Sequence, residues 1–330
     1  MLWIRPDLRI DRPIDSAVFD VDGVLIDTTR SYRLAVIATT NYIVGVQRGL
    51  WQPNAAGGQP LVTLEDVRAF KLAGGFNNDW DLAFALTALC TAQRREWRGQ
   101  PEAARSLLAW AEHAHDAAQR GQGGIAWARH VTPTSAQPSY DLAQTIHDEF
   151  YWGANLLRSM VGREPRYVLD APGLVRNEEL LMPDALLASL AEQGTTRFAL
   201  ITGRVGAEVT WAVKALQHTG AYATRFASRW GPTPFEQIIP GEEIAKPDPE
   251  ALRLTAKRLE TSAGLYVGDT ADDLALVLNY RAVADAGQPP FLAVMIASGP
   301  EAEVYRARGA DLILAQIGEL PAALGELPRA

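Results

Sequence analysis

The chain has 330 residues, of which 48% are apolar, and its formal net charge is −8. This length allows two domains or one domain with a large insertion. The acidic balance, with no block of Lys and Arg, argues against a nucleic-acid partner. The apolar stretches are all too short for a bilayer-spanning helix, so no membrane association is expected.

The sequence contains a single cysteine, Cys90, within an apolar helical pattern. A disulfide within the chain is therefore excluded, and a reducing cytoplasm is the expected compartment. We expect Cys90 to be a small buried apolar side chain. The histidines lack metal-binding spacing and companion cysteines, so zinc is not expected. The oligomeric state stays open, a homo-oligomer included.

The first predicted element is a short buried strand over residues 16–20, which ends in Asp20. From about residue 29 to about residue 180 the pattern is helical, with apolar residues at helical spacing. We expect helices within 63–73, 78–97, 101–120 and 140–160, the first opened by a Thr63–Asp66 capping pair. Two segments rich in Gly, Pro and polar residues, 53–60 and 121–138, are expected to be linkers.

From about residue 180 onward, strands and helices alternate. Apolar runs predict strands at 198–201, 264–268, 291–297 and 311–314. Helices are expected between them, one with Asp248 as N-cap and Pro249 at the first helical position. Because the strands are almost continuously apolar, we expect an α/β fold with a Rossmann-like parallel sheet covered on both faces. Residues 1–28 and 181–330 would form this core, and 29–180 an inserted, mostly α-helical domain.

Polar residues follow several of these strands, at the sheet edge where parallel α/β proteins bind ligands. They are Asp20, Asp22 and Gly23 after the first strand, Thr202 and Gly203 after the second, Lys246 on a loop, and Asp269 and Asp273 after a later strand. Carboxylates that converge in one cleft repel each other. A hard divalent cation relieves this repulsion, and a set of oxygen ligands selects Mg²⁺.

Magnesium commonly binds a substrate phosphate as well. Lys246 and Thr202 would hold the remaining phosphate oxygens, while the turns at Gly23 and Gly203 let backbone N–H groups approach. Thr202 has a second interpretation as the N-cap of the helix that follows, and the two roles are compatible.

The stretches DVDGV, LITGR, AKPDPE and VGDTADD resemble, in order, the four motifs of the haloacid dehalogenase-like superfamily. The helical insertion falls between the first two, as in the branch with a helical cap, the phosphoglycolate phosphatase-like subfamily. The resemblance implies a Mg²⁺-dependent phosphatase that hydrolyses a small soluble phosphomonoester through an aspartyl-phosphate intermediate. Asp20 would be the nucleophile and Asp22 the general acid and base. The implied metal ligands are Asp20, the backbone carbonyl of Asp22, Asp269 and, directly or through water, Asp273.

Three other functions fit parts of the pattern. A sugar phosphomutase would use the same aspartyl-phosphate and return the phosphoryl group to its substrate. A haloacid dehalogenase does without the metal site that Asp22, Asp269 and Asp273 imply. A non-catalytic binding protein has no physical reason to keep several like charges together.

Substrate selectivity is expected from the insertion. The segment 70–84 gathers Lys71, Asn77 and Asn78 before a helix, which suits a loop that closes over a substrate. The alternative is that Asn78 or Asp79 caps this helix while Trp80 packs in the core. Arg33 would contact a substrate anion or lie in solvent.

Overall fold

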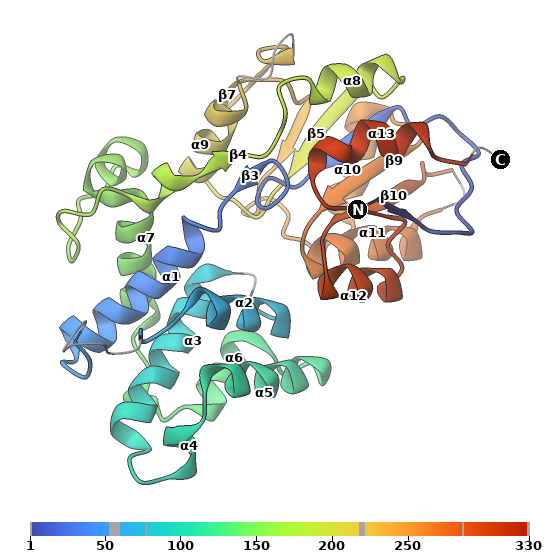
Figure 1. Cartoon of the computed structure of the whole chain (residues 1–330). Coiled ribbons are helices and arrows are strands. Elements are labelled where there is room, and N and C mark those ends of the chain that lie inside the picture. Colours follow the sequence, from blue (N-terminus) through green and yellow to red (C-terminus); the bar gives the residue numbers. More distant parts are fainter. Residues whose placement is uncertain (1, 53–59, 77, 218–221, 286, 329–330) are drawn as a thin grey trace. The chain divides into compact units, whose positions relative to one another are not determined.

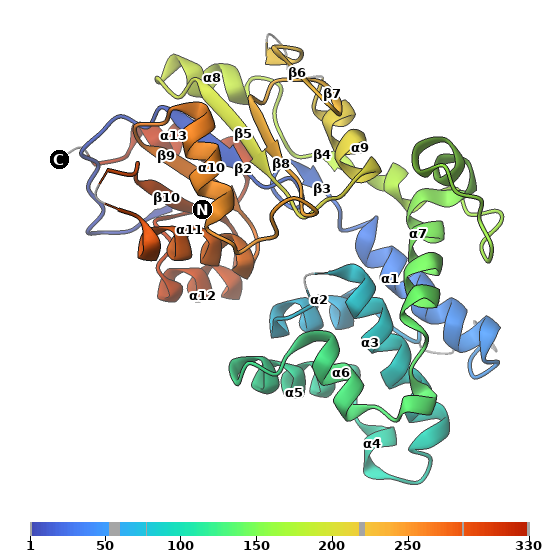
Figure 2. The same ribbon diagram turned by 180° about the vertical axis from the view of Figure 1, so that it is seen from behind.

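The computed structural model describes residues 2–52, 60–76, 78–217, 222–285 and 287–328. The chain divides into two compact units, shown in Figures 1 and 2. Unit 1 consists of Met1–Asp27 and Glu179–Ala330, and unit 2 of Thr28–Glu178. That these units act as a catalytic core and a substrate-selecting cap stays a prediction.

Within the described part of unit 1, seven strands form one sheet in the order β1-β11-β10-β9-β2-β5-β8. Neighbouring strands are parallel except at the edge, where β1 runs antiparallel to β11. The predicted α/β fold with a parallel sheet is therefore confirmed. The strands are β1 (Trp3–Ile4), β2 (Ser16–Phe19), β5 (Arg197–Ile201), β8 (Gln237–Ile239), β9 (Gly264–Gly268), β10 (Phe291–Ile296) and β11 (Leu312–Leu314).

Helices cover both faces of this sheet, and alternate residues of each strand enter the two layers. In β2, Ala17 and Phe19 pack in one core while Val18 packs in the other. This two-sided burial is why the strands are uninterrupted apolar runs. The first core includes α8 (Leu186–Glu192), α9 (Ala207–Leu216) and α13 (Leu320–Gly325), and the second α10 (Glu250–Leu259), α11 (Ala271–Val283) and α12 (Pro300–Arg308).

The strand order reverses beside β2. The chain passes from β2 to β5 and β8 on one side, then returns to β9 on the other side of β2 and continues to β10 and β11. In open parallel sheets the ligand crevice lies at such a reversal, beyond the carboxyl ends of the strands. Asp20 follows β2 and Asp269 follows β9, so both lie at this point.

Two short antiparallel two-stranded sheets complete the described strands of unit 1. In one, β3 pairs with β4 where the chain leaves unit 1 and where it returns. In the other, β6 pairs with β7 after α9. Their bounds are β3 (Ile26–Asp27), β4 (Glu179–Leu180), β6 (Phe226–Ser228) and β7 (Gly231–Thr233).

Unit 2 is helical, as predicted. Its main core is a cluster of buried apolar residues from α2, α3, α5 and α6, with Trp97 and Trp110 stacked at a ring distance of 5.3 Å. The helices are α1 (Tyr32–Asn41), α2 (Leu64–Ala73), α3 (Asp79–Thr91), α4 (Pro101–Ala104), α5 (Leu107–Gln119), α6 (Gly124–Val131) and α7 (Tyr140–Leu156). The described helices of the chain all fall short, in length or in hydropathy, of what a bilayer-spanning helix needs.

One predicted linker is wrong. Within 121–138 the structure has helix α6, whose Trp127 is buried against Phe70 and Phe76 and donates a hydrogen bond of 3.0 Å to His113 Nδ1. The segment is rich in turn-forming residues, but burial of the indole in the core decides its structure. Of the other predicted linker, residues 53–59 lie outside the described residues.

Helix starts were predicted with mixed success. The Thr63–Asp66 capping box at the start of α2 is confirmed. The N-cap of α10 is Pro249 rather than Asp248, although Asp248 Oδ1 accepts a hydrogen bond of 2.9 Å from the Glu250 N–H. The single helix expected over 101–120 is two helices, because the Ser106 side chain caps α5 by accepting from the Ala109 N–H.

Candidate active site

Asp20 and Lys246 form the centre of the candidate site. Asp20 directly follows β2, and its backbone N–H donates to Val267 O at 2.8 Å, which ties the strand tip to β9. The Asp20 carboxylate is almost completely buried, with 3% of the residue exposed. Lys246, on the loop ahead of α10, places Nζ 2.9 Å from Asp20 Oδ1 and 2.7 Å from Asp273 Oδ1. One buried ammonium therefore bridges two carboxylates.

Asp273 lies in the first turn of α11 and is fully buried. Its Oδ1 accepts hydrogen bonds of 2.7 Å from both Lys246 and Tyr266. Its Oδ2 accepts from the backbone of Asp269 and Thr270 and from the Thr270 hydroxyl, which closes a capping box. Both oxygens are thus already engaged by protein donors.

Asp269 follows β9 and packs against Gly23. A Cβ atom on Gly23, whose φ is +75°, would lie 2.0 Å from Asp269 Oδ2, so a side chain at position 23 would displace this carboxylate. Asp269 Oδ1 is buried, and no described residue donates a hydrogen bond to it. Its backbone carbonyl accepts from the Tyr305 hydroxyl at 2.8 Å.

Asp22 is held by Arg204, a residue that the sequence analysis missed. Arg204 Nε and Nη2 lie 2.8 and 2.7 Å from the same oxygen, Asp22 Oδ1. The Arg204 side chain is fully buried, whereas the Asp22 side chain is 29% exposed. The available signal in the sequence was the position of Arg204 directly after Thr202 and Gly203, at the end of a predicted strand.

Thr202 follows β5 and is buried, and its hydroxyl oxygen accepts from the Arg204 N–H at 3.1 Å. It is not the N-cap of α9, because Gly206 holds that position. A Cβ on Gly203 would meet no atom within 4 Å, so the space beside this glycine is open. Thr202 and Gly203 thus follow β5, the neighbour of β2 in the sheet, and their role in phosphate binding stays a prediction.

Burial governs the ionisation of the acids in the site, and repulsion between them adds to its effect. Burial raises the pKa of Asp20 to about 7, against the lowering effect of Lys246 and with a further rise from Asp273 and Asp22. Burial, with Asp273 and Asp20 nearby, also holds the pKa of Asp269 well above its usual range. Burial acts in the same direction on Asp273, but Lys246 and the donated hydrogen bonds bring its pKa below the usual range. Two of the three buried acids thus resist ionisation.

These acids fit a hard divalent cation. Oxygens of Asp20, Asp269 and Asp273 lie within 4.8 Å of one another. The buried, unpartnered Asp269 Oδ1 is an acceptor with no protein donor. Four carboxylates here face the two cations Lys246 and Arg204, which leaves a charge that one divalent ion neutralises. All-oxygen donors favour Mg²⁺ over zinc.

The predicted selectivity residues of unit 2 have local partners. Asn78 caps α3, since its Oδ1 accepts from the backbone N–H groups of Trp80 and Asp81. This agrees with the expected alternative in which Asn78 or Asp79 caps the helix. Lys71 Nζ lies 3.1 Å from Asp79 Oδ1. Arg33 is half-buried in the first turn of α1, and Asn77 lies outside the described residues. A role of these residues in substrate selection stays a prediction.

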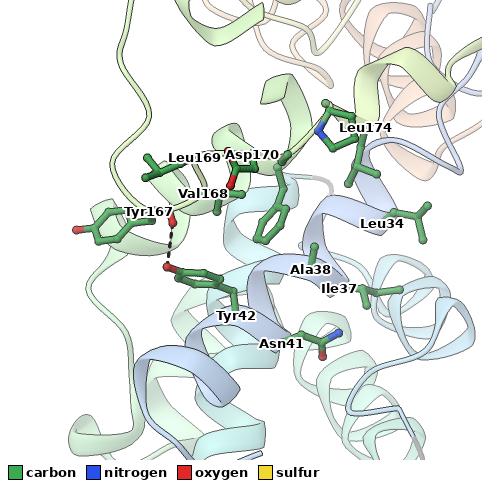
Figure 3. A pocket seen from close by; sticks show the side chains of 14 residues that line it. Leu34, Ile37, Ala38, Asn41, Tyr42, Tyr167, Val168, Leu169, Asp170 and Leu174 are labelled. Atoms are coloured by element: carbon green, nitrogen blue, oxygen red, sulfur yellow. Dashed lines mark hydrogen bonds between the residues drawn. The ribbon is translucent and has the colours of Figure 1, made fainter. Parts of the chain in front are cut away.

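Unit 2 also has an open hollow of about 690 Å³ along one face of α1, shown in Figure 3. Leu34 and Ala38 line it from α1 and Tyr42 from just after this helix, and the Tyr42 hydroxyl donates to Tyr167 O at 3.0 Å. Of the predicted selectivity residues that the structure describes, Lys71, Asn78 and Arg33 do not line this hollow.

A buried carboxylate–lysine cluster at the strand reversal of a parallel sheet defines an enzyme of the Rossmann-like α/β class. The chain belongs to the haloacid dehalogenase-like hydrolases, because that family's model matches residues 14–276. The predicted family is therefore confirmed.

Known proteins are similar over most of the chain. Phosphatase Tt82 from Thermococcus thioreducens is 27% identical, with a TM-score of 0.57 over 86% of this chain and 93% of its own. A candidate phosphoglycolate phosphatase from Lactobacillus delbrueckii subsp. bulgaricus, 16% identical with a TM-score of 0.52 over 95% and 99% of the two chains, shares the fold. An imidazoleglycerol-phosphate dehydratase from Phytophthora nicotianae is 25% identical over 274 residues, which are 82% of this chain. The chain matches only 43% of that relative's length.

Proposed function

We propose that the protein is a Mg²⁺-dependent phosphatase that hydrolyses a small phosphomonoester through an aspartyl-phosphate on Asp20. The observation that carries this proposal is the buried cluster in which Asp20, Asp269 and Lys246 meet beside the open space at Gly203. The similarity to a solved phosphatase at 27% identity supports the same reaction.

In the first step, a carboxylate oxygen of Asp20 attacks the substrate phosphorus, and the bond between phosphorus and the ester oxygen breaks. Lys246 orients Asp20 and offsets its charge. The Thr202 hydroxyl and the N–H groups near Gly203 would bind the phosphoryl oxygens. Asp22 donates a proton to the departing ester oxygen, so the substrate leaves as an alcohol.

In the second step, water attacks the phosphorus of the aspartyl-phosphate. Asp22, now ionised, takes the proton of this water, and the bond between Asp20 and phosphorus breaks. Inorganic phosphate leaves and Asp20 is regenerated. The partial exposure of the Asp22 side chain gives this carboxylate access to both the leaving oxygen and the water.

Asp20, Asp269 and the Asp22 carbonyl would hold Mg²⁺, which when bound neutralises negative charge on the transferring phosphoryl group. Asp273, which was expected to hold the metal directly or through water, is assigned a different task. Because both of its oxygens accept protein hydrogen bonds, it positions Lys246 and the turn that carries Asp269.

Release of inorganic phosphate from p-nitrophenyl phosphate tests the proposal. We expect turnover by the wild type with Mg²⁺ and a loss of about 10³-fold or more in Asp20→Asn. Wild-type protein incubated briefly with substrate and quenched in acid should carry an acid-stable, hydroxylamine-sensitive phosphate that Asp20→Asn lacks. Equal turnover by the two proteins would rule out Asp20 as nucleophile.

A further inference from the structure

Arg204 combines features that a surface arginine lacks. Its side chain is fully buried, and it is the largest of the completely buried side chains described. Burying a guanidinium costs free energy unless an anion compensates it. Asp22 compensates this charge, because its Oδ1 accepts from both Nε and Nη2. Asp22 is the predicted general acid and base, so this arginine acts on the residue that moves protons.

The turn that carries Arg204 is held from several sides. Its backbone N–H donates to Thr202 Oγ1 at 3.1 Å, and its carbonyl accepts from the Gly241 N–H at 3.0 Å. Gly241 must be a glycine here, since a Cβ would lie 2.6 Å from Gly203 O. The backbone that carries the Arg204 guanidinium therefore has little freedom to move.

Nε and Nη2 of Arg204 both contact one oxygen of Asp22, while Nη1 donates to Glu208 O at 3.5 Å. A planar guanidinium fixes the direction of its donated bonds better than an ammonium can. With Oδ1 held in this way, rotation of the carboxylate is restricted. Oδ2 is then the oxygen left for the substrate, on a side chain that keeps 29% of its surface exposed.

The geometry points to Arg204 as a positioning residue that holds Asp22 by Oδ1, so that Oδ2 delivers the proton to the leaving oxygen and later takes one from water. This inference rests on the proposed phosphatase reaction. A positioning role can be distinguished from a purely structural one, because a misplaced Asp22 impairs the proton transfer more than the attack by Asp20.

Two substrates of similar shape make this difference measurable. Phenyl phosphate releases an oxygen whose conjugate acid has a pKa of about 10, like the tyrosine phenol, and it needs a proton donor. p-Nitrophenyl phosphate releases a much more acidic phenol, which departs without one. Loss of general acid catalysis, about 10²-fold or more when complete, therefore falls mainly on phenyl phosphate.

The experiment measures kcat/KM for both substrates in the wild type, Asp22→Asn, Arg204→Met, Arg204→Lys and Arg281→Met. Arg281 is the matched control, because it pairs with the buried Asp311 in the same unit but lies outside the site. We expect Arg204→Met to lose about tenfold more activity on phenyl than on p-nitrophenyl phosphate, in the direction of Asp22→Asn. Arg204→Lys should lie between, and Arg281→Met should leave the ratio of the two substrates at the wild-type value.

An equal loss on both substrates in Arg204→Met and Arg204→Lys, while Asp22→Asn remains selective, would overturn the inference. If Arg204→Met does not fold, Arg204→Lys carries the test, since it keeps a positive charge and alters the direction of the contact. Turnover that persists in Asp20→Asn would instead rule out the proposed aspartyl-phosphate reaction. Failure of that reaction is therefore distinguishable from failure of the role of Arg204.

Discussion

The two units contain the same local motif with different consequences. In unit 2, Thr63 and Asp66 form a capping box that starts α2, and Asp66 Oδ2 accepts from the Thr63 N–H and hydroxyl. In unit 1, Thr270 and Asp273 form the same box at the start of α11. There the second oxygen of Asp273 faces Lys246 and Tyr266 in a fully buried position.

The difference comes from topology rather than from the motif. Helix α11 begins after β9, beside the reversal of strand order, so its capping acid lies within the site. Helix α2 begins after a loop of a helical unit, and its capping acid serves the helix alone. A short polar motif thus acquires a chemical role from the element that precedes it.

The two lysines of the predicted site allow the strongest test of this contrast. Lys246→Met should lower the free energy of unfolding by about 3–5 kcal/mol, because it leaves Asp20 and Asp273 buried without their cation. Lys71→Met removes a partly exposed ion pair, whose side chains are 23% and 15% exposed, and should cost about 0–1 kcal/mol. Urea unfolding at pH 8 in EDTA measures both. Equal losses would contradict the assigned burial of the Lys246 pair.

Two glycines of unit 1 differ in the space around them, since Gly23 is crowded by Asp269 and Gly203 is not crowded. Gly23→Ala brings a methyl group 2.0 Å from Asp269 Oδ2, at a φ of +75°, and we expect activity to fall by about 100-fold. Gly203→Ala meets no protein atom within 4 Å and should keep the unfolding midpoint of the wild type. If phosphate occupies that space, Gly203→Ala still raises KM. Unchanged kinetics in Gly203→Ala would contradict the assignment of Gly203 to the phosphate site.

Metal and pH should act together on unit 1. Because the folded pKa of Asp20 is raised to about 7, the folded protein keeps a proton that the unfolded chain releases. In EDTA, this carboxyl's contribution to stability is therefore complete at low pH and declines from about pH 4 to about pH 7. Mg²⁺ at ten times its Kd should add about 1.4 kcal/mol.

The added stability should be larger at pH 8 than at pH 5, since the ion binds ionised carboxylates. Thermal unfolding with Mg²⁺ and with EDTA across this range measures the effect. Asp20→Asn, which cannot titrate at this position, is the control. An effect of Mg²⁺ that is equal at both pH values would contradict the cluster as its site.

The smallest expected effect concerns Asn78 in unit 2. Asn78→Ala removes the N-cap of α3 and should cost about 1 kcal/mol of stability. KM and kcat should stay at the wild-type values if the side chain only caps the helix. Asn78→Asp, which keeps a capping oxygen, should restore the stability. A rise in KM in Asn78→Ala without loss of stability would instead support the substrate-loop interpretation.

Much of unit 1 could be predicted because its strands are buried on both faces. Each apolar run is followed by a polar residue at the carboxyl end of its strand. The pattern alone therefore places Asp20, Thr202 and Asp269 at the same end of the sheet. Lys246 could be included because it precedes a helix on a short loop. The edge strands β1 and β8, of two and three residues, were missed because such short runs carry no periodicity.

Arg204 could not be found in the same way. Its contact with Asp22 joins residues 182 positions apart, and an arginine beside glycine has the composition of a surface turn. Likewise, the helix α6 is defined by Trp127 entering a core built from distant helices. Both misses arise where tertiary burial outweighs local preference.

The insertion of unit 2 after β3 has a consequence for biosynthesis. Thr28–Glu178 is one continuous segment, so it can fold on the ribosome before the rest of the chain has emerged. Asp20 leaves the exit tunnel early but meets its partners only after Asp269, 249 residues later in the 330-residue chain, has also emerged. The nascent protein therefore gains its reactive centre last, and a stalled or truncated product would be a folded helical unit without chemistry.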